Sequence, residues 1–421
     1  MKAVEAEPEE AGLLKRLGPG LVTGAADDDP SGIATYSQVG AQFGYALTWT
    51  MLFSLPLMIA IQEISGRIGC VTGRGIAENL RRHYSPWLVR TIVVLLLVAN
   101  TINIGADLGA MGAAMRLLIG GDQRLYTVVF GVVCVLAEVF ISYANYARTL
   151  KWLTVVLFAY VAVVFSVHLP WQQALSATFV PRIALNSAGA MALVAVLGTT
   201  ISPYLFFWQS SLEVQERMRR GVEPGCLSPE TAAPQLKRIR TDTMVGMCIS
   251  NVIAVFIIYA TAATLHAKGI TTIQTSAQAA EALRPIAGPL TFVIFATGII
   301  GTGLLAVPVL AGSSAYALAE TFRWREGLDQ KLEKAKWFYG AIAVSTLVGV
   351  ALNFTKLDPV KALYWSAVVN GVLAAPVMAV IMLIAGNEQI MQELKLRGAI
   401  RVMGWLATLV MVVASVAFFV L

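Results

Sequence analysis

The sequence predicts an all-α polytopic membrane protein with about eleven transmembrane helices. Its 421 residues are 57% hydrophobic and only 13% charged, and the mean hydropathy is +0.70. Soluble domains carry about 25% charged residues, so this chain has too few polar side chains for a large soluble domain. A helix needs about 20 residues to cross a bilayer. The apolar segments cover approximately 17–45, 46–68, 88–119, 125–145, 150–169, 188–215, 241–265, 287–320, 337–353, 360–386 and 401–420.

The distribution of Lys and Arg supports this number of spans. If the N-terminus is cytoplasmic, the N-terminal tail and alternate loops hold 24 of the 31 Lys and Arg residues, and 7 fall on the other side. Positive residues accumulate in cytoplasmic loops, so we expect a cytoplasmic N-terminus and a C-terminus on the opposite side. We expect the protein in the plasma (inner) membrane. The longest cytoplasmic loop, 217–242, is rich in Pro and charge and is interpreted as a solvated linker.

The spans suggest a division of the chain into a tail, a core and an addition. Residues 1–16 are acidic and polar, and form a cytoplasmic N-terminal tail rather than a cleavable signal, which would begin with a basic segment. The transmembrane core covers 17–386, with two repeats at about 17–169 and 188–386. Residues 387–421 add a cytoplasmic loop and a further C-terminal transmembrane helix.

The first span is interrupted at its centre. Its middle holds Asp27, Asp28, Asp29, Pro30, Ser31 and Gly32. Asp29 lies roughly 18 Å along a helix from residue 17, near the middle of the bilayer, where one Asp costs about 2.5–3.5 kcal/mol. Pro30 removes an amide donor, so the helix should open and leave bare carbonyls beside carboxylates. Such backbone is tolerated only when shielded from lipid, and its oxygens suit a hard cation. Asp27 either lines the vestibule or caps the broken helix.

The sixth span contains a second interruption, from Gly198 through Thr199, Thr200, Ile201 and Ser202 to Pro203. Pro30 and Pro203 each stand in the first span of a set of five. An odd number of spans inverts the second set relative to the first. Interrupted spans at corresponding places in two halves indicate a transporter site at the interface of the repeats.

Other kinds of chemistry find little support in the sequence. The four cysteines show no C-x-x-C spacing, and the three histidines are not paired at helical spacing, which argues against a disulfide framework or a zinc site. Neither a nucleophile–base constellation nor a phosphate-binding loop occurs, so we expect no enzyme and no cofactor. The basic residues form no groove for nucleic acid. The expected partners are a divalent metal ion as substrate and the lipid bilayer, and the oligomeric state is not defined.

The order of these motifs resembles the Nramp family of divalent metal transporters. That family opens its first span with G-P-G and breaks it at D-P-G-N, and the matching residues here are 18–20 and 29–32. The segments AQFGYALTW, IQEISGRIGCVTGRGIAENL and ADLGAMG are also similar to the family's sequence. The resemblance covers essentially the whole chain. It implies a leucine-transporter-type five-plus-five inverted repeat with broken helices 1 and 6.

The resemblance also implies an ion site with an altered set of ligands. The family's aspartate corresponds to Asp29, with Asp28 nearby. Gly32 stands in place of an asparagine, Thr199 in place of an alanine that offers its carbonyl, and Ser202 in place of a methionine. Without the thioether, the bias toward softer metals is lost and an all-oxygen site remains. We therefore expect a divergent member, similar to the Nramp-related magnesium transporters, that moves Mg²⁺ and/or Mn²⁺ by alternating access.

The residues for proton coupling differ as well. The family's third-span aspartate matches Asp107, but the glutamate three residues on is Ala110, and the family's sixth-span histidine is Tyr204. A proton relay needs titratable groups in series, so weak or absent proton coupling is predicted. Asp107, Tyr204 and Asn370 are candidates for the permeation path, although helix–helix hydrogen bonds explain Asp107 and Asn370 equally well.

Two alternative functions stay open at this point. One is a typical proton-coupled importer of Mn or Fe. The other is an organic-solute symporter of the same fold, for example for amino acids. Three adjacent aspartates would repel a carboxylate substrate, which argues against the symporter.

Overall fold

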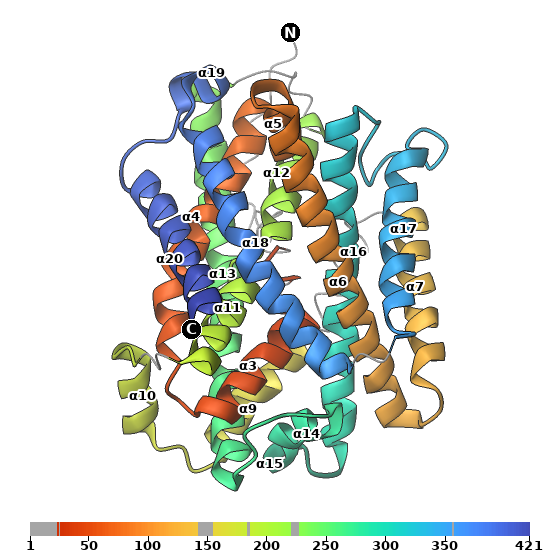
Figure 1. The fold of residues 1–421 in the computed structure, drawn as a ribbon, viewed down its shortest axis with the longest axis vertical. Helices are drawn as coiled ribbons and strands as arrows, with labels where there is room; N and C mark the ends of the chain where they lie inside the picture. Colours follow the sequence, from red (N-terminus) through yellow and green to blue (C-terminus); the bar gives the residue numbers. More distant parts are fainter. Residues whose placement is uncertain (1–22, 25, 142–154, 183–185, 220–226, 356–357) are drawn as a thin grey trace, which may run out of the picture.

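The computed structural model describes residues 23–24, 26–141, 155–182, 186–219, 227–355 and 358–421. In these ranges every regular element is a helix. The long helices run roughly along the long axis of the molecule, and the short helices α10, α14 and α15 lie at one end (Figure 1). Helices α5 and α19 lie at the other end. The described elements form a helical bundle.

The helices follow one another along the chain in the following order. They are α3 Pro30–Phe43, α4 Trp49–Thr72, α5 Ile76–His83, α6 Pro86–Ile119, α7 Gln123–Phe140, the 3₁₀ turn η1 Val155–Leu157, α9 Phe158–Ser166, α10 Trp171–Phe179, α11 Ser187–Thr200, α12 Pro203–Arg219, α13 Pro229–Thr264, α14 Ser276–Ala280, α15 Arg284–Ala287, α16 Thr291–Phe322, α17 Lys336–Leu352, α18 Pro359–Gly386, α19 Glu388–Met391 and α20 Ala399–Val420.

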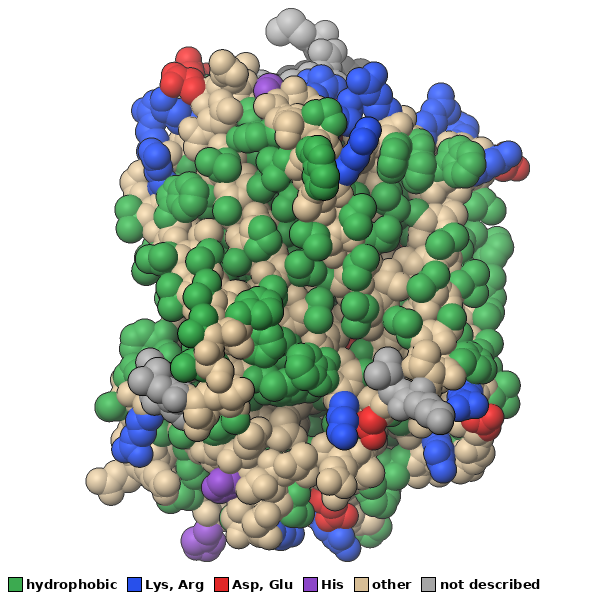
Figure 2. Space-filling model, viewed as in Figure 1, with side chains coloured by type: hydrophobic (Ala, Val, Ile, Leu, Met, Phe, Trp, Pro, Cys, Tyr) green, Lys and Arg blue, Asp and Glu red, His purple; other side chains and the backbone are tan. Residues whose placement is uncertain are grey.

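The predicted membrane spans correspond to these helices. Within the described part of the chain, 8 helical segments are long and apolar enough to cross a membrane. Two shorter apolar helices, Val155–Ser166 and Lys336–Leu352, match the fifth and ninth predicted spans, and α3 is the second half of the first. A belt of hydrophobic side chains covers the middle of the molecule, and charged side chains gather at its two ends (Figure 2). The all-α membrane fold predicted from the sequence is confirmed.

The packing repeats when each helix is exchanged for its counterpart five spans later. Helix α3 packs on α13, and its counterpart α12 packs on α4 in the same way. Helix α6 packs on α7 as α16 packs on α17, while α6 and α16 pack on each other. This exchange pattern is what an inverted repeat produces, and it places α3 and the α11–α12 pair near the centre of the bundle.

Several helices begin with a capping residue followed by proline. The caps that accept a backbone N–H are Asp29, Ser85, Ser228 and Asp358. Proline is tolerated at the first helical position because its missing N–H would have no partner there. Helix α13 starts in this way at Pro229, inside the segment expected to be a linker. The expectation of a solvated linker is therefore wrong from residue 229 onward: these residues are the first turns of a 36-residue helix.

Candidate metal-binding site

The first span is broken at Asp29, which caps α3. Asp29 has extended backbone angles, φ −69° and ψ 169°, and Pro30 follows as the first helical residue. Its Oδ1 accepts hydrogen bonds from the backbone N–H of Gly32 at 2.6 Å and from the Ser31 hydroxyl at 2.7 Å. The break predicted at this proline is therefore present. It holds a carboxylate against the positive end of a helix dipole.

The sixth span is broken between α11 and α12. Helix α11 ends at Thr200, Ile201 leaves the helical conformation with φ −122° and ψ 63°, and α12 starts at Pro203. The Ser202 hydroxyl bridges the gap by lying 3.0 Å from the carbonyl oxygen of Gly198 and 2.9 Å from that of Thr199. The Thr199 carbonyl thus lies at the end of a helix, with one of its two lone pairs facing this hydroxyl.

The two breaks meet inside the bundle. A Cβ placed on Gly32 would lie 3.1 Å from Thr199 Oγ1 and 3.4 Å from Asp29 Oδ1. The Tyr204 hydroxyl donates to the carbonyl oxygen of Ala26 at 3.1 Å, which ties α12 to the segment before Asp29. The structure therefore brings Asp29, Gly32 and Thr199 together, with the hydroxyl of Ser202 on the Thr199 carbonyl.

Helix α6 contributes a residue to this place that sequence reasoning missed. Asn103 is fully buried, and its Nδ2 donates to Asp29 Oδ2 at 3.0 Å. Asp107 lies one turn further along α6, also fully buried, and it is close enough to Asp29 for the two charges to interact. The Asn103 side chain could have been suspected because it lies four residues before Asp107, on the same helix face.

The other two aspartates are held by a different helix. The Ser250 hydroxyl on α13 lies 2.8 Å from Asp27 Oδ2 and 3.0 Å from Asp28 Oδ1. Asp29, in contrast, is bound to Asn103 on α6. The three carboxylates therefore do not converge, and in the described part of the chain no group of three His, Cys, Asp or Glu side chains is arranged to hold a metal. Asp28 does not form a ready-made pair with Asp29.

Asn370 lies on α18, where that helix packs closely against α11. Gly371, the next residue, would bring a Cβ to 2.4 Å from the carbonyl oxygen of Val194 and 3.2 Å from the Cα of Gly198. Asn370 is 2% exposed, and its Oδ1 has no hydrogen-bond partner. The structure thus places Asn370 on a helix that packs against the last turns of α11, which end at the second break.

The three aspartates carry uncompensated negative charge in the interior. Asp27, Asp28 and Asp29 are 1–3% exposed. No Lys or Arg among the described residues forms an ion pair with any of them. An unpaired buried carboxylate is strongly disfavoured. The arrangement therefore calls for a positive ion, or for protons, at this depth.

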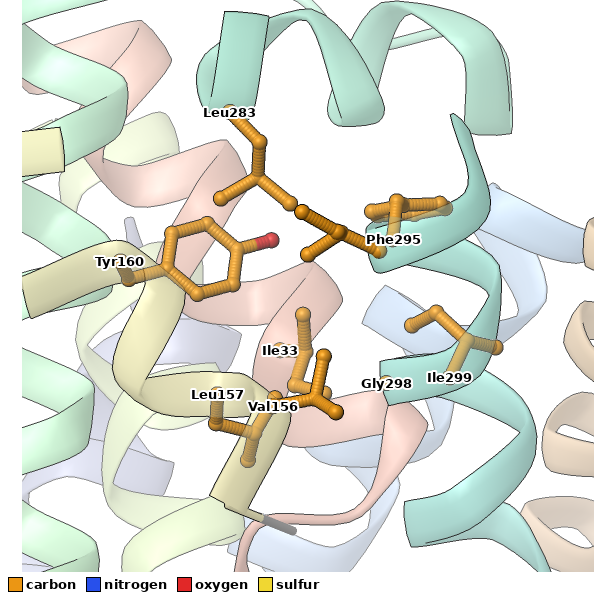
Figure 3. Close-up of a pocket in the computed structure, with 9 residues that line it drawn as sticks. Ile33, Val156, Leu157, Tyr160, Leu283, Phe295, Gly298 and Ile299 are labelled. Atoms are coloured by element: carbon orange, nitrogen blue, oxygen red, sulfur yellow. The ribbon is translucent and has the colours of Figure 1, made fainter. Parts of the chain in front are cut away.

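A small apolar cavity adjoins the first turn of α3. It lies next to Ile33, between α3, α9 and α16, and holds only about 10 Å³ (Figure 3). Its walls include Tyr160, Leu283, Phe295 and Ile299. A cavity needs about 10–15 Å³ to hold one water, so a hydrated cation does not fit in this cavity.

Polar contacts join α12 to the first span and to α13. The Thr23 hydroxyl donates to Gln209 Oε1 at 2.7 Å, and Gln209 Nε2 donates to Glu213 Oε1 at 3.2 Å. Glu213 in turn forms an ion pair with Arg238 on α13. This chain of contacts connects Thr23, in the first span, to α12 and α13.

The fold and the opposed breaks define a class of protein. An inverted repeat with two interrupted helices meeting at mid-depth is the architecture of secondary transporters. Comparison with solved structures agrees. A manganese transporter of Eremococcus coleocola in complex with an aromatic bis-isothiourea substituted compound superposes with a TM-score of 0.75, at 17% identity, over 98% of this chain and 88% of that one. Mhp1, a nucleobase-cation-symport-1 family transporter, gives 0.57 at 15% identity, over 96% and 92%.

The sequence comparison then gives the family. Residues 20–421 match the family described as Natural resistance-associated macrophage protein-like, and the chain belongs to this Nramp family. A divalent metal cation transporter MntH of Klebsiella pneumoniae (strain 342) is 26% identical over 95% of this chain and 92% of its own length. A protein of the same name from Deinococcus radiodurans is 28% identical over 71% and 68%. The family and the inverted-repeat fold expected from the resemblance are confirmed.

Proposed function

We propose that the protein transports divalent metal cations across the membrane by alternating access, with Mg²⁺ and/or Mn²⁺ as the favoured ions. The observation that carries the proposal is the buried Asp29 carboxylate, which forms no ion pair with a described Lys or Arg and lies where two helix breaks meet. Relatives named divalent metal cation transporter support the class of substrate. Asp29 would be the anionic ligand, and the Thr199 carbonyl would add a neutral oxygen beside Gly32.

The chemistry of the donors supports a hard ion that keeps part of its water shell. The oxygens at the breaks come from a carboxylate, hydroxyls and carbonyls, and Ser202 offers no sulfur. Soft donors favour transition metals, whereas carboxylates, carbonyls and water suit Mg²⁺ and Mn²⁺. Mg²⁺ is usually held by one or two carboxylates with several waters, which agrees with a site where only Asp29 is placed at the breaks.

The proposal includes uptake without an obligatory proton. Ala110 and Tyr204 cannot relay protons as a glutamate and a histidine would, and Asp107 alone is no series. The membrane potential is a sufficient driving force, because a divalent ion gains about 4.6 kcal/mol per 100 mV, twice the value for one charge. We place the N-terminus in the cytoplasm of a plasma (inner) membrane, with repeats 17–169 and 188–386 and the addition 387–421.

Purified protein in liposomes tests this function directly. With a potential negative inside, we expect saturable uptake of Mg²⁺ and Mn²⁺, and a flat signal from a pH dye trapped inside. With equal metal concentrations on both sides, imposing a pH gradient without a potential should drive no net uptake. Absence of any divalent flux would refute the transport function, and internal acidification in proportion to the metal taken up would refute the uncoupled mechanism.

A single substitution tests the role of Ser202 in ion choice. Ser202→Met restores a thioether beside the Thr199 carbonyl, so Mn²⁺ and Cd²⁺ should be preferred over Mg²⁺ by about tenfold more than in the unmodified protein, because soft ligands select softer metals. Competition of each metal against radioactive Mn²⁺ uptake measures this ratio. Ser202→Leu is the control, since leucine has a similar volume without sulfur. An equal shift in both variants would show that size, not the sulfur, sets the preference.

A further inference from the structure

Asn103 differs from other buried amides on the same helix in what it binds. Its Nδ2 donates only to Asp29 Oδ2, the carboxylate proposed above as the ion's ligand, at 3.0 Å. Asn100, one turn earlier on α6, instead uses its Nδ2 to bind the Leu310 carbonyl at 3.1 Å and the Ser314 hydroxyl at 3.0 Å on α16. Asn100 thus fastens two helices together, whereas Asn103 faces a charged group in the candidate site.

The other end of the Asn103 side chain is unsatisfied. Its Oδ1 is buried without a hydrogen-bond partner, as is the Oδ1 of Asn100. A bare buried oxygen is costly, and it is therefore not by itself a sign of function. Asn103 and Asn100 differ in their hydrogen-bond partner. The amide of Asn103 donates to Asp29, so a cation that binds Asp29 Oδ2 would lie next to the Asn103 NH₂ group.

We infer that Asn103 is a metal ligand, and that its amide turns over when the ion binds. This inference rests on the proposed function and extends it to a further residue. In this structure the NH₂ group donates to Asp29. A cation at Oδ2 repels that NH₂ dipole and attracts the unpartnered Oδ1. Rotation about χ2 exchanges the two, because the terminal torsion of Asn is broad and roughly two-fold and the amide keeps its outline.

The distance between the two groups fits the ion. After the exchange, Oδ1 would occupy the position that Nδ2 holds now, 3.0 Å from Asp29 Oδ2. Two neighbouring ligands of an octahedral Mg²⁺, at bond lengths of about 2.0–2.1 Å, are about 2.9 Å apart. Ca²⁺ binds 6–8 oxygens at about 2.3–2.6 Å, often in a pentagonal bipyramid, where neighbouring ligands are also roughly 2.7–3.1 Å apart. The spacing of Asn103 and Asp29 therefore fits a pair of neighbouring ligands of one divalent ion.

The test compares three variants with the unmodified protein. Asn103→Leu keeps the shape and removes both polar atoms, Asn103→Asp keeps an oxygen in either orientation, and Asn100→Leu is the matched control on the same helix. For each, Mg²⁺ uptake into liposomes gives the apparent KM, and thermal unfolding with and without MgCl₂ gives the ion-induced rise in Tm.

For Asn103→Leu we expect an apparent KM for Mg²⁺ that is about 10 to 100 times higher, on the order of the loss seen when groups around a metal are removed. Asn103→Asp should unfold at a lower temperature without metal, because two carboxylates then face each other, and should show a larger rise in Tm with MgCl₂ than the unmodified protein. Asn100→Leu should lower the Tm and leave the KM unchanged.

An unchanged KM in Asn103→Leu would overturn the inference, and so would a smaller Mg²⁺-induced rise in Tm for Asn103→Asp. If Asn103→Leu does not fold, the Asp variant alone decides. A loss of Mg²⁺ affinity in Asn100→Leu as large as that in Asn103→Leu would show that both residues act by holding helices in place, and that Asn103 is not a ligand. If the unmodified protein neither binds nor transports any divalent ion, the proposed function itself is refuted. If the unmodified protein transports the ion and the Asn103 variants have the same KM, only this inference is refuted.

Discussion

Replacing Asp29 with alanine should reduce divalent metal uptake by about 100-fold or more while the protein still folds. The expected loss exceeds the 10–100-fold typical of groups behind the ligands, because Asp29 is the one carboxylate that lies at both helix breaks. Folding should survive, because loss of the cap on α3 costs only about 1 kcal/mol and a buried charge is removed at the same time. Uptake into liposomes and the elution profile on size exclusion measure the two effects.

The chain contains a matched control for this variant. Asp358 also caps a helix immediately before a proline, and its Oδ1 accepts from the N–H groups of Val360 and Lys361 at 2.9 and 3.2 Å. It is exposed at the start of α18, away from the breaks. Asp358→Ala should therefore lose a cap of the same kind and keep normal uptake. Normal uptake by Asp29→Ala would remove the carboxylate from the site altogether.

Gly198→Ala should impair both stability and transport. A Cβ on Gly198 would lie 2.1 Å from the carbonyl oxygen of Ala367 and 2.4 Å from the backbone N of Gly371, so α11 and α18 must move apart. Overpacking of this kind costs about 1–3 kcal/mol. Residue 198 also precedes Thr199, and a displacement of about 1 Å in a preorganised site can cost on the order of 100-fold in function. We expect a lower Tm, and a reduced uptake because Thr199 is displaced.

Gly340→Ala is the control for this second prediction. Gly340 lies in α17, where an added Cβ would meet nothing within 4 Å. Alanine is favoured over glycine in a helix by about 0.5–1 kcal/mol, so this variant should be as stable as the unmodified protein or slightly more so. Thermal unfolding in detergent and Mg²⁺ uptake compare the two. Equal behaviour of both variants would mean that the α11–α18 contact tolerates a methyl group and is not tight.

The spans were predictable because the bilayer leaves few choices. A membrane requires about 20 apolar residues in a helix, and the sequence shows this pattern wherever the structure has a long helix. The breaks were predictable because Asp29–Pro30 and Ser202–Pro203 place polar residues and a helix-breaking proline in the middle of an apolar span. The start of α13 was missed because the segment 217–242 is rich in Pro and charge, although its serine before proline at 228–229 is typical of a helix start.

The candidate site was predictable only in part, since several of its contacts come from distant helices. The sequence places Asp29 and Gly32 in one segment, but nothing in it shows that Asn103 reaches Asp29, 74 residues away. A lone Asn in an apolar helix is most simply explained by a helix–helix hydrogen bond, and for Asn100 that explanation is right. Ser250 was likewise invisible, although it determines where Asp27 and Asp28 lie.

The hydrogen bond from Tyr204 to the carbonyl of Ala26 has a consequence for turnover. It joins α12 to the segment before Asp29, and under the alternating access proposed above this bond would break whenever the two segments separate. In many enzymes the opening of a closed form, not the chemistry within it, limits the overall rate. The number of ions carried per second would then depend on the strength of this hydrogen bond, whereas the affinity for the ion would depend on its ligands.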